Sequence, residues 1–187
     1  MDQQKELLVV VDMQNDFITG VLGSAAAQAI VPKVVEKIND YQQKGCMIIA
    51  TMDTHTDNEY KLSEEGQRLP MHCCVSQEDI SGWKIHPDVA KALEKRDAFT
   101  AHIRKNVYGS TDLAKQLGMW QPNHIEFVGL CTDVCVVSNA LLARSFLPNA
   151  TIVVDASCCA GVTPETHKAA LQVMKCCGIQ IVNEVQE

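Results

Sequence analysis

Short apolar runs alternate along the chain with segments in which apolar residues recur at helical spacing. The apolar runs are rich in β-branched residues, which is typical of strands covered on both faces of a sheet. These runs lie at 7–11, 47–50, 125–130, 151–154 and 179–182. Helical patterns lie over 25–43, 87–95, 132–146 and 164–177, and a short strand is expected over 99–104. The repeated strand-helix-strand order predicts a three-layer α/β/α sandwich around a mainly parallel sheet.

The last helical pattern carries signals for both of its ends. Thr163 is a suitable N-cap, and Pro164 suits the first helical turn. Gly178 suits the position just after a helix. These residues place the helix over 164–177.

The length of the chain, 187 residues, is near the usual size of one domain. No internal repeat, low-complexity tract or linker interrupts it, so one domain over 1–187 is expected. The irregular segment 53–83 is the exception to the regular alternation. Loops of that length in compact domains are usually functional.

Charge is spread along the chain without acidic or basic blocks, and 16 basic against 23 acidic residues give a net charge of −7. The sequence shows no cluster of basic residues such as nucleic-acid-binding proteins carry. We therefore expect a small-molecule substrate and no nucleic-acid partner. No apolar stretch approaches the roughly 18 residues of a membrane span, and the first residues are too polar for a signal peptide. We therefore expect a cytoplasmic protein with no membrane partner.

The nine cysteines are numerous for a chain of this length. Six of them form the vicinal pairs Cys73–Cys74, Cys158–Cys159 and Cys176–Cys177. Neighbouring cysteines rarely bridge each other, and a chain of this size does not depend on disulfides. We interpret the cysteines as reduced thiols, most of them small buried hydrophobic residues.

Candidate chemistry gathers where predicted strands end, which is where open α/β sheets bind ligands. Asp12 follows the first strand, and Cys135 lies in the first turn of the helix expected from Thr132. Helix N-termini lower the pKa of a thiol, and their free N–H groups can hold an oxyanion. Burial would raise the pKa of Asp12 toward that of a base. Taken singly, each residue also has an ordinary structural explanation. Cys135 fits a packed core thiol, Asp12 a buried capping aspartate and Lys105 a solvated lysine.

Three segments resemble motifs of the isochorismatase-like cysteine hydrolases, in the order found in that family. They are Leu8–Phe17 (LVVVDMQNDF), Ile103–Leu113 (IRKNVYGSTDL) and Val128–Val136 (VGLCTDVCV). The resemblance runs from about residue 7 to residue 182 and implies the same three-layer fold. It also implies Asp12, Lys105 and Cys135 as catalytic residues, a cis peptide between Leu130 and Cys131, and an oxyanion hole formed by the backbone amides of Cys131 and Cys135.

A metal site is expected within the segment 53–83. Asp53 and His55 follow a strand in an Asp-x-His pattern, which places both side chains on one side of extended backbone. Together with His72 and a glutamate they offer two imidazoles and two carboxylates, a set that suits Zn²⁺, Fe²⁺ or Mn²⁺. The same pattern resembles the nicotinamidase branch of the family, which implies the ligands Asp53, His55, His72 and Glu65, with Zn²⁺ favoured. Whether Glu65 or Glu64 completes the set stays open.

Phe17, Trp83 and Tyr108 are candidates for the walls of a substrate pocket, because flat heteroaromatic substrates stack on aromatic side chains. Two features depart from the nicotinamidase pattern. Cys73 and Cys74 follow His72 directly and could bind a metal themselves, and the segment 76–83 lacks a Gly-Thr pattern often found there. Because of these departures, the sequence does not determine the identity of the substrate.

The function expected from the resemblance is hydrolysis of nicotinamide to nicotinate and ammonia through a thioester, with a divalent metal orienting the substrate. Other family members act on another carboxamide, a carbamoyl compound or isochorismate, and these are the alternatives. A non-catalytic thiol-redox protein on the same fold is a further one. The resemblance also implies a homo-oligomer.

Overall fold

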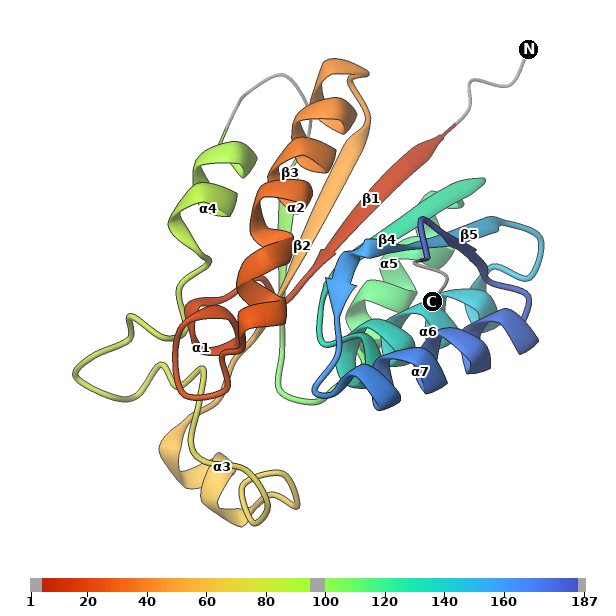
Figure 1. The fold of residues 1–187 in the computed structure, drawn as a ribbon. Coiled ribbons are helices and arrows are strands. Elements are labelled where there is room, and N and C mark those ends of the chain that lie inside the picture. The colour runs from red at the N-terminus through yellow and green to blue at the C-terminus, as the bar shows by residue number, and fades with distance from the viewer. Residues whose placement is uncertain (1–4, 95–99, 185–187) are drawn as a thin grey trace.

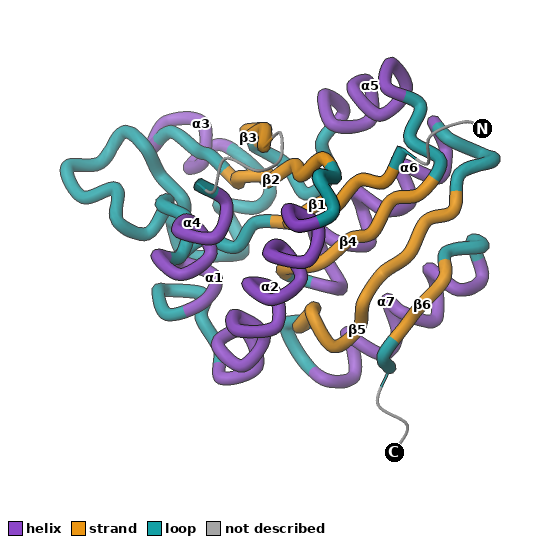
Figure 2. Tube along the Cα trace, turned by 90° about the horizontal axis from the view of Figure 1, so that it is seen from above, coloured by secondary structure: helices purple, strands orange, loops and turns teal. Residues whose placement is uncertain are grey.

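The computed structural model describes residues 5–94 and 100–184. All described strands form one six-stranded sheet in the order β3-β2-β1-β4-β5-β6, and each neighbouring pair is parallel (Figure 2). The strands are β1 Glu6–Val11, β2 Met47–Asp53, β3 Thr100–Lys105, β4 His124–Leu130, β5 Thr151–Ala160 and β6 Gln180–Val182. The parallel sheet and all six expected strands are therefore confirmed; the first residue expected in β3, at 99, lies outside the described residues.

Helices cover both faces of this sheet, as the alternation of elements predicts (Figure 1). The helices are α1 Asn15–Ile18, α2 Ala25–Gln43, α3 Asp57–Leu62, α4 Pro87–Leu93, α5 Thr111–Trp120, α6 Val137–Phe146 and α7 Pro164–Cys176. A π-helical turn, η1 Thr132–Val136, precedes α6. The expected helices over 25–43 and 164–177 are confirmed nearly to the residue, whereas α1, α3 and α5 were not expected.

Alternate residues of β1 enter two separate hydrophobic clusters. Leu7, Val9 and Val11 pack with α5, α6 and α7, whereas Leu8 and Val10 pack with α2 and α4. A strand buried on both faces needs apolar residues at every position, which explains its unbroken run.

The strand order reverses direction between β1 and β4, and α/β sheets of this order form their ligand crevice at that point. Gly129, near the end of β4, allows the two strands to approach closely here. Its φ is +116°, and a Cβ at this position would lie 2.1 Å from the carbonyl oxygen of Val11. The two strands therefore deliver the residues that follow them, Asp12 and the turn leading to Cys135, to one place.

The ends of α7 follow the signals in the sequence. The Thr163 side chain accepts from the N–H of Thr166, and Thr166 caps Thr163 in return. Gly178 adopts φ +75° just after the helix. The expected helix over 132–146 instead begins as the π turn η1. The helix expected over 87–95 ends at Leu93 with Glu94 as its C-cap, and residue 95 itself lies outside the described residues. None of the helices within the described ranges is long and apolar enough to cross a lipid bilayer.

Candidate active site

Three reactive side chains from separate strand ends meet at the point where the strand order reverses. Nζ of Lys105 lies 2.7 Å from Oδ2 of Asp12 and 3.4 Å from Sγ of Cys135. All three residues are buried. The structure thus brings together the residues for which the sequence predicted catalytic roles.

The carboxylate of Asp12 is held in place by the adjacent strand β2. Asp12 adopts φ +47° directly after β1, and its N–H donates to the carbonyl oxygen of Thr51 at 3.2 Å. The Thr51 hydroxyl donates to Oδ1 of Asp12 at 2.7 Å. One carboxylate oxygen is therefore fixed by Thr51, and the other faces Lys105.

Burial sets the proton affinities of this group. Burial raises the pKa of Asp12, and the positive charge of Lys105 only partly offsets that rise. Burial and the nearby charge of Asp12 also raise the pKa of the Cys135 thiol well above its ordinary value. The sequence had predicted a lowered thiol pKa from the helix N-terminus, but removal from water outweighs that effect. The thiol is consequently protonated at rest, and a base must remove its proton.

Lys105 stays charged in this buried position because carboxylates surround it. Burial alone would lower its pKa, but Asp12, Cys135 and Asp53 together raise it well above the ordinary value. Asp53 Oδ1 lies 3.3 Å from Nζ. Register explains this contact, since Asp53 and Lys105 are paired neighbours at the ends of β2 and β3.

Cys135 lies in the π turn that follows β4. The peptide between Leu130 and Cys131 is cis, as the family resemblance implied. The carbonyl oxygen of Cys131 accepts from the N–H groups of Val134 at 3.1 Å and Val136 at 3.0 Å. These bonds curl the backbone so that residues 131 and 135 both face the space above the strand ends.

That space is a cavity of about 290 Å³. Its wall contains Cys131 and Cys135, and it extends to Asp53, Glu65 and His72. The rest of the wall is mainly apolar and is formed by Phe17, Leu22, Gly23, Ser24, Ala27, Leu69, Leu130, Val134, Gly161 and Val162. Reactive groups at one end of a largely apolar pocket suit a small organic substrate.

Of the three aromatic residues predicted for the pocket walls, one lies there. Phe17 lines the cavity, with its ring centroid 5.3 Å from that of His72 in an edge-to-face arrangement. Trp83 and Tyr108, the other two candidates, are not among the residues that line this cavity. The Trp83 indole instead donates to Oγ1 of Thr54 at 3.0 Å, and the Tyr108 hydroxyl accepts from Arg68 at 3.1 Å. Both side chains use their polar ends to fix neighbouring loops.

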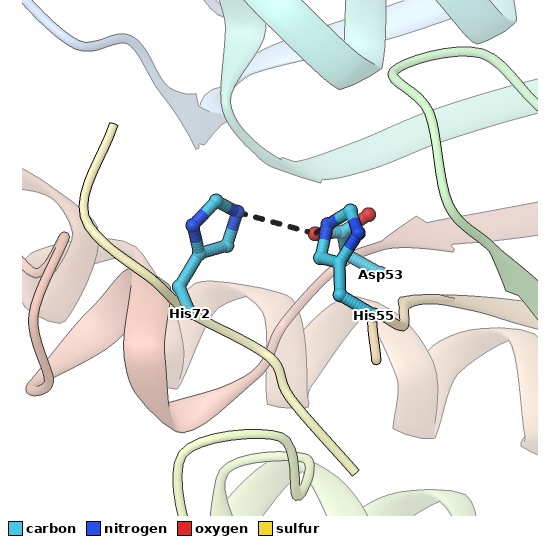
Figure 3. A group of neighbouring side chains, drawn as sticks. All are labelled: Asp53, His55 and His72. Carbon is cyan, nitrogen blue, oxygen red and sulfur yellow. Dashed lines mark hydrogen bonds and ion pairs between the residues drawn. The ribbon is translucent and has the colours of Figure 1, made fainter. Parts of the chain in front are cut away.

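Next to the cluster of Asp12, Lys105 and Cys135 lies a second group. Asp53, His55 and His72 converge there from the end of β2 and from the loop after it (Figure 3). Their potential ligand atoms all lie within 4.8 Å of one another. Nε2 of His55 is 2.7 Å from Oδ2 of Asp53, and Nε2 of His72 is 3.3 Å from the same oxygen. One carboxylate therefore faces both the two imidazoles and Lys105.

The orientation of His72 fits a cation at this cluster. Its Nε2 is buried and makes no hydrogen bond, although Asp53 and Glu65 lie nearby. Its Nδ1 lies 2.9 Å from the carbonyl oxygen of Pro70 and 3.0 Å from the hydroxyl of Tyr60. A proton on Nδ1 leaves a lone pair on Nε2 directed at the cluster, which is the usual tautomer of a metal-binding histidine. The residues present therefore fit a divalent ion.

The sequence left two questions about the metal site: which glutamate belongs to it, and whether Cys73 or Cys74 could bind the ion. Distances in the structure bear on both. Oε1 of Glu65 lies 3.7 Å from Nε2 of His72, and Glu65 lines the cavity, so it is better placed than Glu64. The cluster formed by the described residues contains no thiol. Sγ of Cys74 donates to Asp57 at 3.1 Å instead, and Cys73 is buried in the apolar cluster beneath α2.

Gln14 was missed in the sequence, although it lies within the first motif. Its Oε1 accepts from the N–H of Asp53 at 2.7 Å, and its Nε2 donates to the carbonyl oxygens of Asp53 at 2.8 Å and Trp83 at 2.7 Å. Gln14 is completely buried and lies two residues after Asp12. The available signal was a polar amide three residues after the end of a buried strand.

Nearly the whole chain matches known proteins closely enough to define its family. Residues 6–185 match the family model for the isochorismatase domain. The crystal structure of a pyrazinamidase of Pyrococcus horikoshii in complex with zinc is similar, with a TM-score of 0.79 and 32% identity, covering 96% of this chain and 99% of that one.

Two curated relatives cover nearly the whole chain as well. The nicotinamidase/pyrazinamidase of Mycobacterium tuberculosis is 27% identical over 199 residues, which are 94% of this chain and 97% of the relative. A probable inactive nicotinamidase of Arabidopsis thaliana is 27% identical over 184 residues, 92% of this chain and 89% of the relative. The chain belongs to the isochorismatase domain family.

Proposed function

We propose that this protein is a cysteine-dependent amidohydrolase that converts nicotinamide to nicotinate and ammonia. One observation carries the proposal: a buried Asp12–Lys105–Cys135 group and an Asp53–His55–His72 cluster open onto the same cavity. The relatives named as nicotinamidases and pyrazinamidases support an amide as the substrate. The complete group also supports activity in this chain, despite its similarity to a relative described as inactive.

The reaction begins with proton transfer from the Cys135 thiol to Asp12, whose raised pKa makes it a stronger base than an ordinary aspartate. The thiolate attacks the amide carbon, and the backbone amides of Cys131 and Cys135 hold the developing oxyanion. Asp12 returns the proton to the leaving nitrogen, so that ammonia departs and a thioester remains. Water activated by Asp12 then releases the acid.

Lys105 acts on both partners of the proton transfer. Its ammonium group lies within 3.4 Å of Sγ of Cys135 and 2.7 Å of Asp12, so it stabilises the negative charge on either one. A charge that moves between two acceptors beside a fixed cation needs little reorganisation of its surroundings. We therefore assign Lys105 to charge stabilisation rather than to proton transfer.

Asp53, His55, His72 and Glu65 would hold a divalent ion, with Zn²⁺ favoured and Fe²⁺ or Mn²⁺ as alternatives. When bound, such an ion supplies a Lewis acid that orients a heteroaromatic substrate by its ring nitrogen. Phe17 forms the aromatic wall beside His72. The apolar part of the cavity excludes water from the thiolate and accepts a flat ring.

The family also supports proposals about the setting of the reaction. The single domain over 1–187 would act in the cytoplasm, where nicotinate can re-enter NAD synthesis by salvage. A homo-oligomer is expected from the resemblance alone. Size-exclusion chromatography with light scattering tests the last point, and a monomer at micromolar concentration would contradict it.

The proposal is tested by ammonia release from nicotinamide, pyrazinamide and several aliphatic amides. The protein is prepared under reducing conditions and loaded separately with Zn²⁺, Mn²⁺ or Fe²⁺. We expect turnover of nicotinamide that is lost in Cys135→Ala and strongly reduced in His55→Ala. His102→Ala is the matched control, because His102 is exposed on β3 and away from the cluster.

Each outcome of this experiment has a definite meaning. Turnover of other amides alone, still dependent on Cys135, would keep the catalytic group and overturn the substrate. Equal activity of His55→Ala and the wild type would overturn the role of the metal. No turnover of any amide would turn attention to isochorismate or to a non-catalytic role.

A further inference from the structure

The catalytic turn contains a second thiol that the proposed reaction does not use. Cys131 and Cys135 both line the cavity, and Cys131 is partly exposed there. All nine cysteines are free. A reactive thiol and a second, accessible thiol that share one cavity are the arrangement found in reversible cysteine oxidation.

The backbone of the turn brings these two residues together. Cys131 is the residue that precedes η1, and its carbonyl oxygen accepts from both Val134 and Val136. The bond from Val136 spans five residues, so residues 131–136 form one closed π turn that contains both cysteines. Disulfides form between Cα atoms separated by about 4.4–6.8 Å. Both cysteines follow β4 within this one turn, so the proposed bridge joins side chains across the turn and lies outside the strands.

We propose that Cys131 is a resolving cysteine, which captures oxidised Cys135 in a reversible disulfide. A peroxide is the oxidant. Asp12 takes the thiol proton, and the Cys135 thiolate attacks one peroxide oxygen, so that an S–O bond forms and the O–O bond breaks. Sulfur is oxidised to the sulfenic acid, and the departing oxygen takes the proton back from Asp12 and leaves as water or an alcohol. The Cys131 thiol then attacks the sulfenic sulfur; an S–S bond forms, the S–O bond breaks, and water leaves with the thiol proton.

The groups that prepare Cys135 for amide hydrolysis also prepare it for oxidation. Asp12 accepts its proton, and Lys105, 3.4 Å from Sγ, stabilises the thiolate that reacts with peroxides. The cavity gives a small peroxide the same access as a substrate. Without a resolving thiol, further oxidation to the sulfinic acid would be irreversible.

Another thiol, that of Cys159, is the strongest competitor for this role. Cys159 belongs to the same hydrophobic cluster as Cys135, and it lies on β5 beside Gly129. It is buried and does not line the cavity. Cys131 is therefore the better placed of the two, and Cys159→Ala provides a matched control.

Oxidation would stop catalysis in a reversible way. The disulfide consumes the nucleophile and places a sulfur bridge where the substrate carbonyl would bind. A dithiol reductant restores both thiols. The inference rests on the proposed function only in requiring that Cys135 be reactive, and its main readout is a mass rather than a rate.

The test treats the metal-loaded full-length protein with hydrogen peroxide, blocks the remaining thiols with iodoacetamide and maps tryptic peptides by mass spectrometry. Residues 116–144 form one tryptic peptide, whose two cysteines are Cys131 and Cys135. We expect this peptide to lose the mass of two hydrogens and to carry no alkyl group. A bridge to Cys159 would instead join it to the peptide of residues 145–168.

Recovery of activity supplies the second readout, with each variant compared with its own untreated rate. After dithiothreitol, we expect recovery at least about fivefold greater in the wild type and in Cys159→Ala than in Cys131→Ala, which should accumulate sulfinic acid. Equal recovery in Cys131→Ala, or sulfinic acid at Cys135 of the wild type with no internal disulfide, would overturn the proposal. If Cys131→Ala does not fold, the wild-type peptide map alone decides. A protein that hydrolyses no amide but forms the disulfide would overturn the proposed function and leave this inference standing.

Discussion

Nζ of Lys105 lies 2.7 Å from Oδ2 of Asp12, and both side chains are almost completely removed from solvent. The Asp12 carboxylate depends on Lys105 for compensation of its charge more than Lys105 depends on Asp12. Lys105 has a second carboxylate, that of Asp53, at 3.3 Å, whereas Lys105 is the cation that offsets the buried charge of Asp12.

This asymmetry predicts different stabilities for two variants. Lys105→Met leaves Asp12 buried without its cation and should lower the free energy of unfolding by about 3–5 kcal/mol. Asp12→Asn leaves Lys105 paired with Asp53 and should cost about 1–3 kcal/mol. Urea unfolding at pH 7 with a chelator present measures both values. A larger loss in Asp12→Asn than in Lys105→Met would contradict the charge arrangement described here.

The pH dependence of activity should report the protonation of Asp12. Burial raises its pKa, and the carboxylate form is the base, so kcat/KM falls as the pH falls through a value above the ordinary range of about 4. Rates of nicotinamide hydrolysis are measured between pH 4 and pH 9, with bound metal determined at each pH so that metal loss is not mistaken for protonation of Asp12. A rate that holds constant down to about pH 4 would rule out this base.

Gln14 is expected to act as a positioning residue for Asp53, one of the proposed metal ligands. Gln14→Leu removes the hydrogen bonds to the backbone of Asp53, so zinc affinity should fall about 10- to 100-fold. Competition with a chelating dye measures the affinity. Gln42→Leu is the matched control, because Gln42 is also buried and donates to a backbone carbonyl, that of Ala92, in another part of the fold. Equal zinc affinity in the two variants would argue against a positioning role.

A second buried charge group, between α2 and the sheet, predicts a pH-dependent stability. Lys37 lies 2.9 Å from Oδ2 of Asp155 and 2.7 Å from Oε1 of Glu126. Burial alone would raise the pKa of Asp155, but hydrogen bonds from Lys37, Ser157 and Asn183 lower it. The stabilisation from Asp155 is therefore complete above its unfolded pKa and is lost as the pH falls through its folded pKa.

Asp155→Asn should cost about 1.5–3 kcal/mol at pH 7, and the difference from the wild type should shrink in acid. Denaturant unfolding at several pH values measures this trend. Asp112→Asn is the surface control, because Asp112 pairs with Lys115 in solvent and should change stability by less than about 0.5 kcal/mol. A constant difference across the pH range would show that Asp155 contributes through packing instead.

The four central strands, β1, β2, β4 and β5, were predictable from the sequence because they are buried on both faces of the sheet. Their apolar runs are continuous, and the acidic residues Asp12 and Asp53 mark their ends. The helix α5 was missed because it is short, contains Gly118 and is surrounded by polar residues. Its two buried leucines, Leu113 and Leu117, pack into the hydrophobic cluster on one face of the sheet. That packing becomes evident only once the fold is known.

The candidate catalytic and metal-site residues were identified from motifs in the sequence, whereas the contacts that support them were not predicted. Gln14 and Asp53 lie 39 residues apart, and only the parallel pairing of β1 with β2 makes them neighbours. Trp83 was assigned to the pocket because aromatic residues suit flat substrates. Its indole instead donates a hydrogen bond to Thr54. That contact depends on the path of the segment 53–83, which the sequence alone does not predict.

The central claim is that Cys135 forms a covalent acyl intermediate, and rapid-quench mass spectrometry tests it most directly. The metal-loaded protein is mixed with nicotinamide, quenched in acid during turnover and digested, and the peptide of residues 116–144 is examined. We predict a nicotinoyl group on Cys135 that disappears when the substrate is exhausted and is absent from Cys135→Ala. Undiminished ammonia release by Cys135→Ala, with no acylated cysteine in the wild type, would contradict the account.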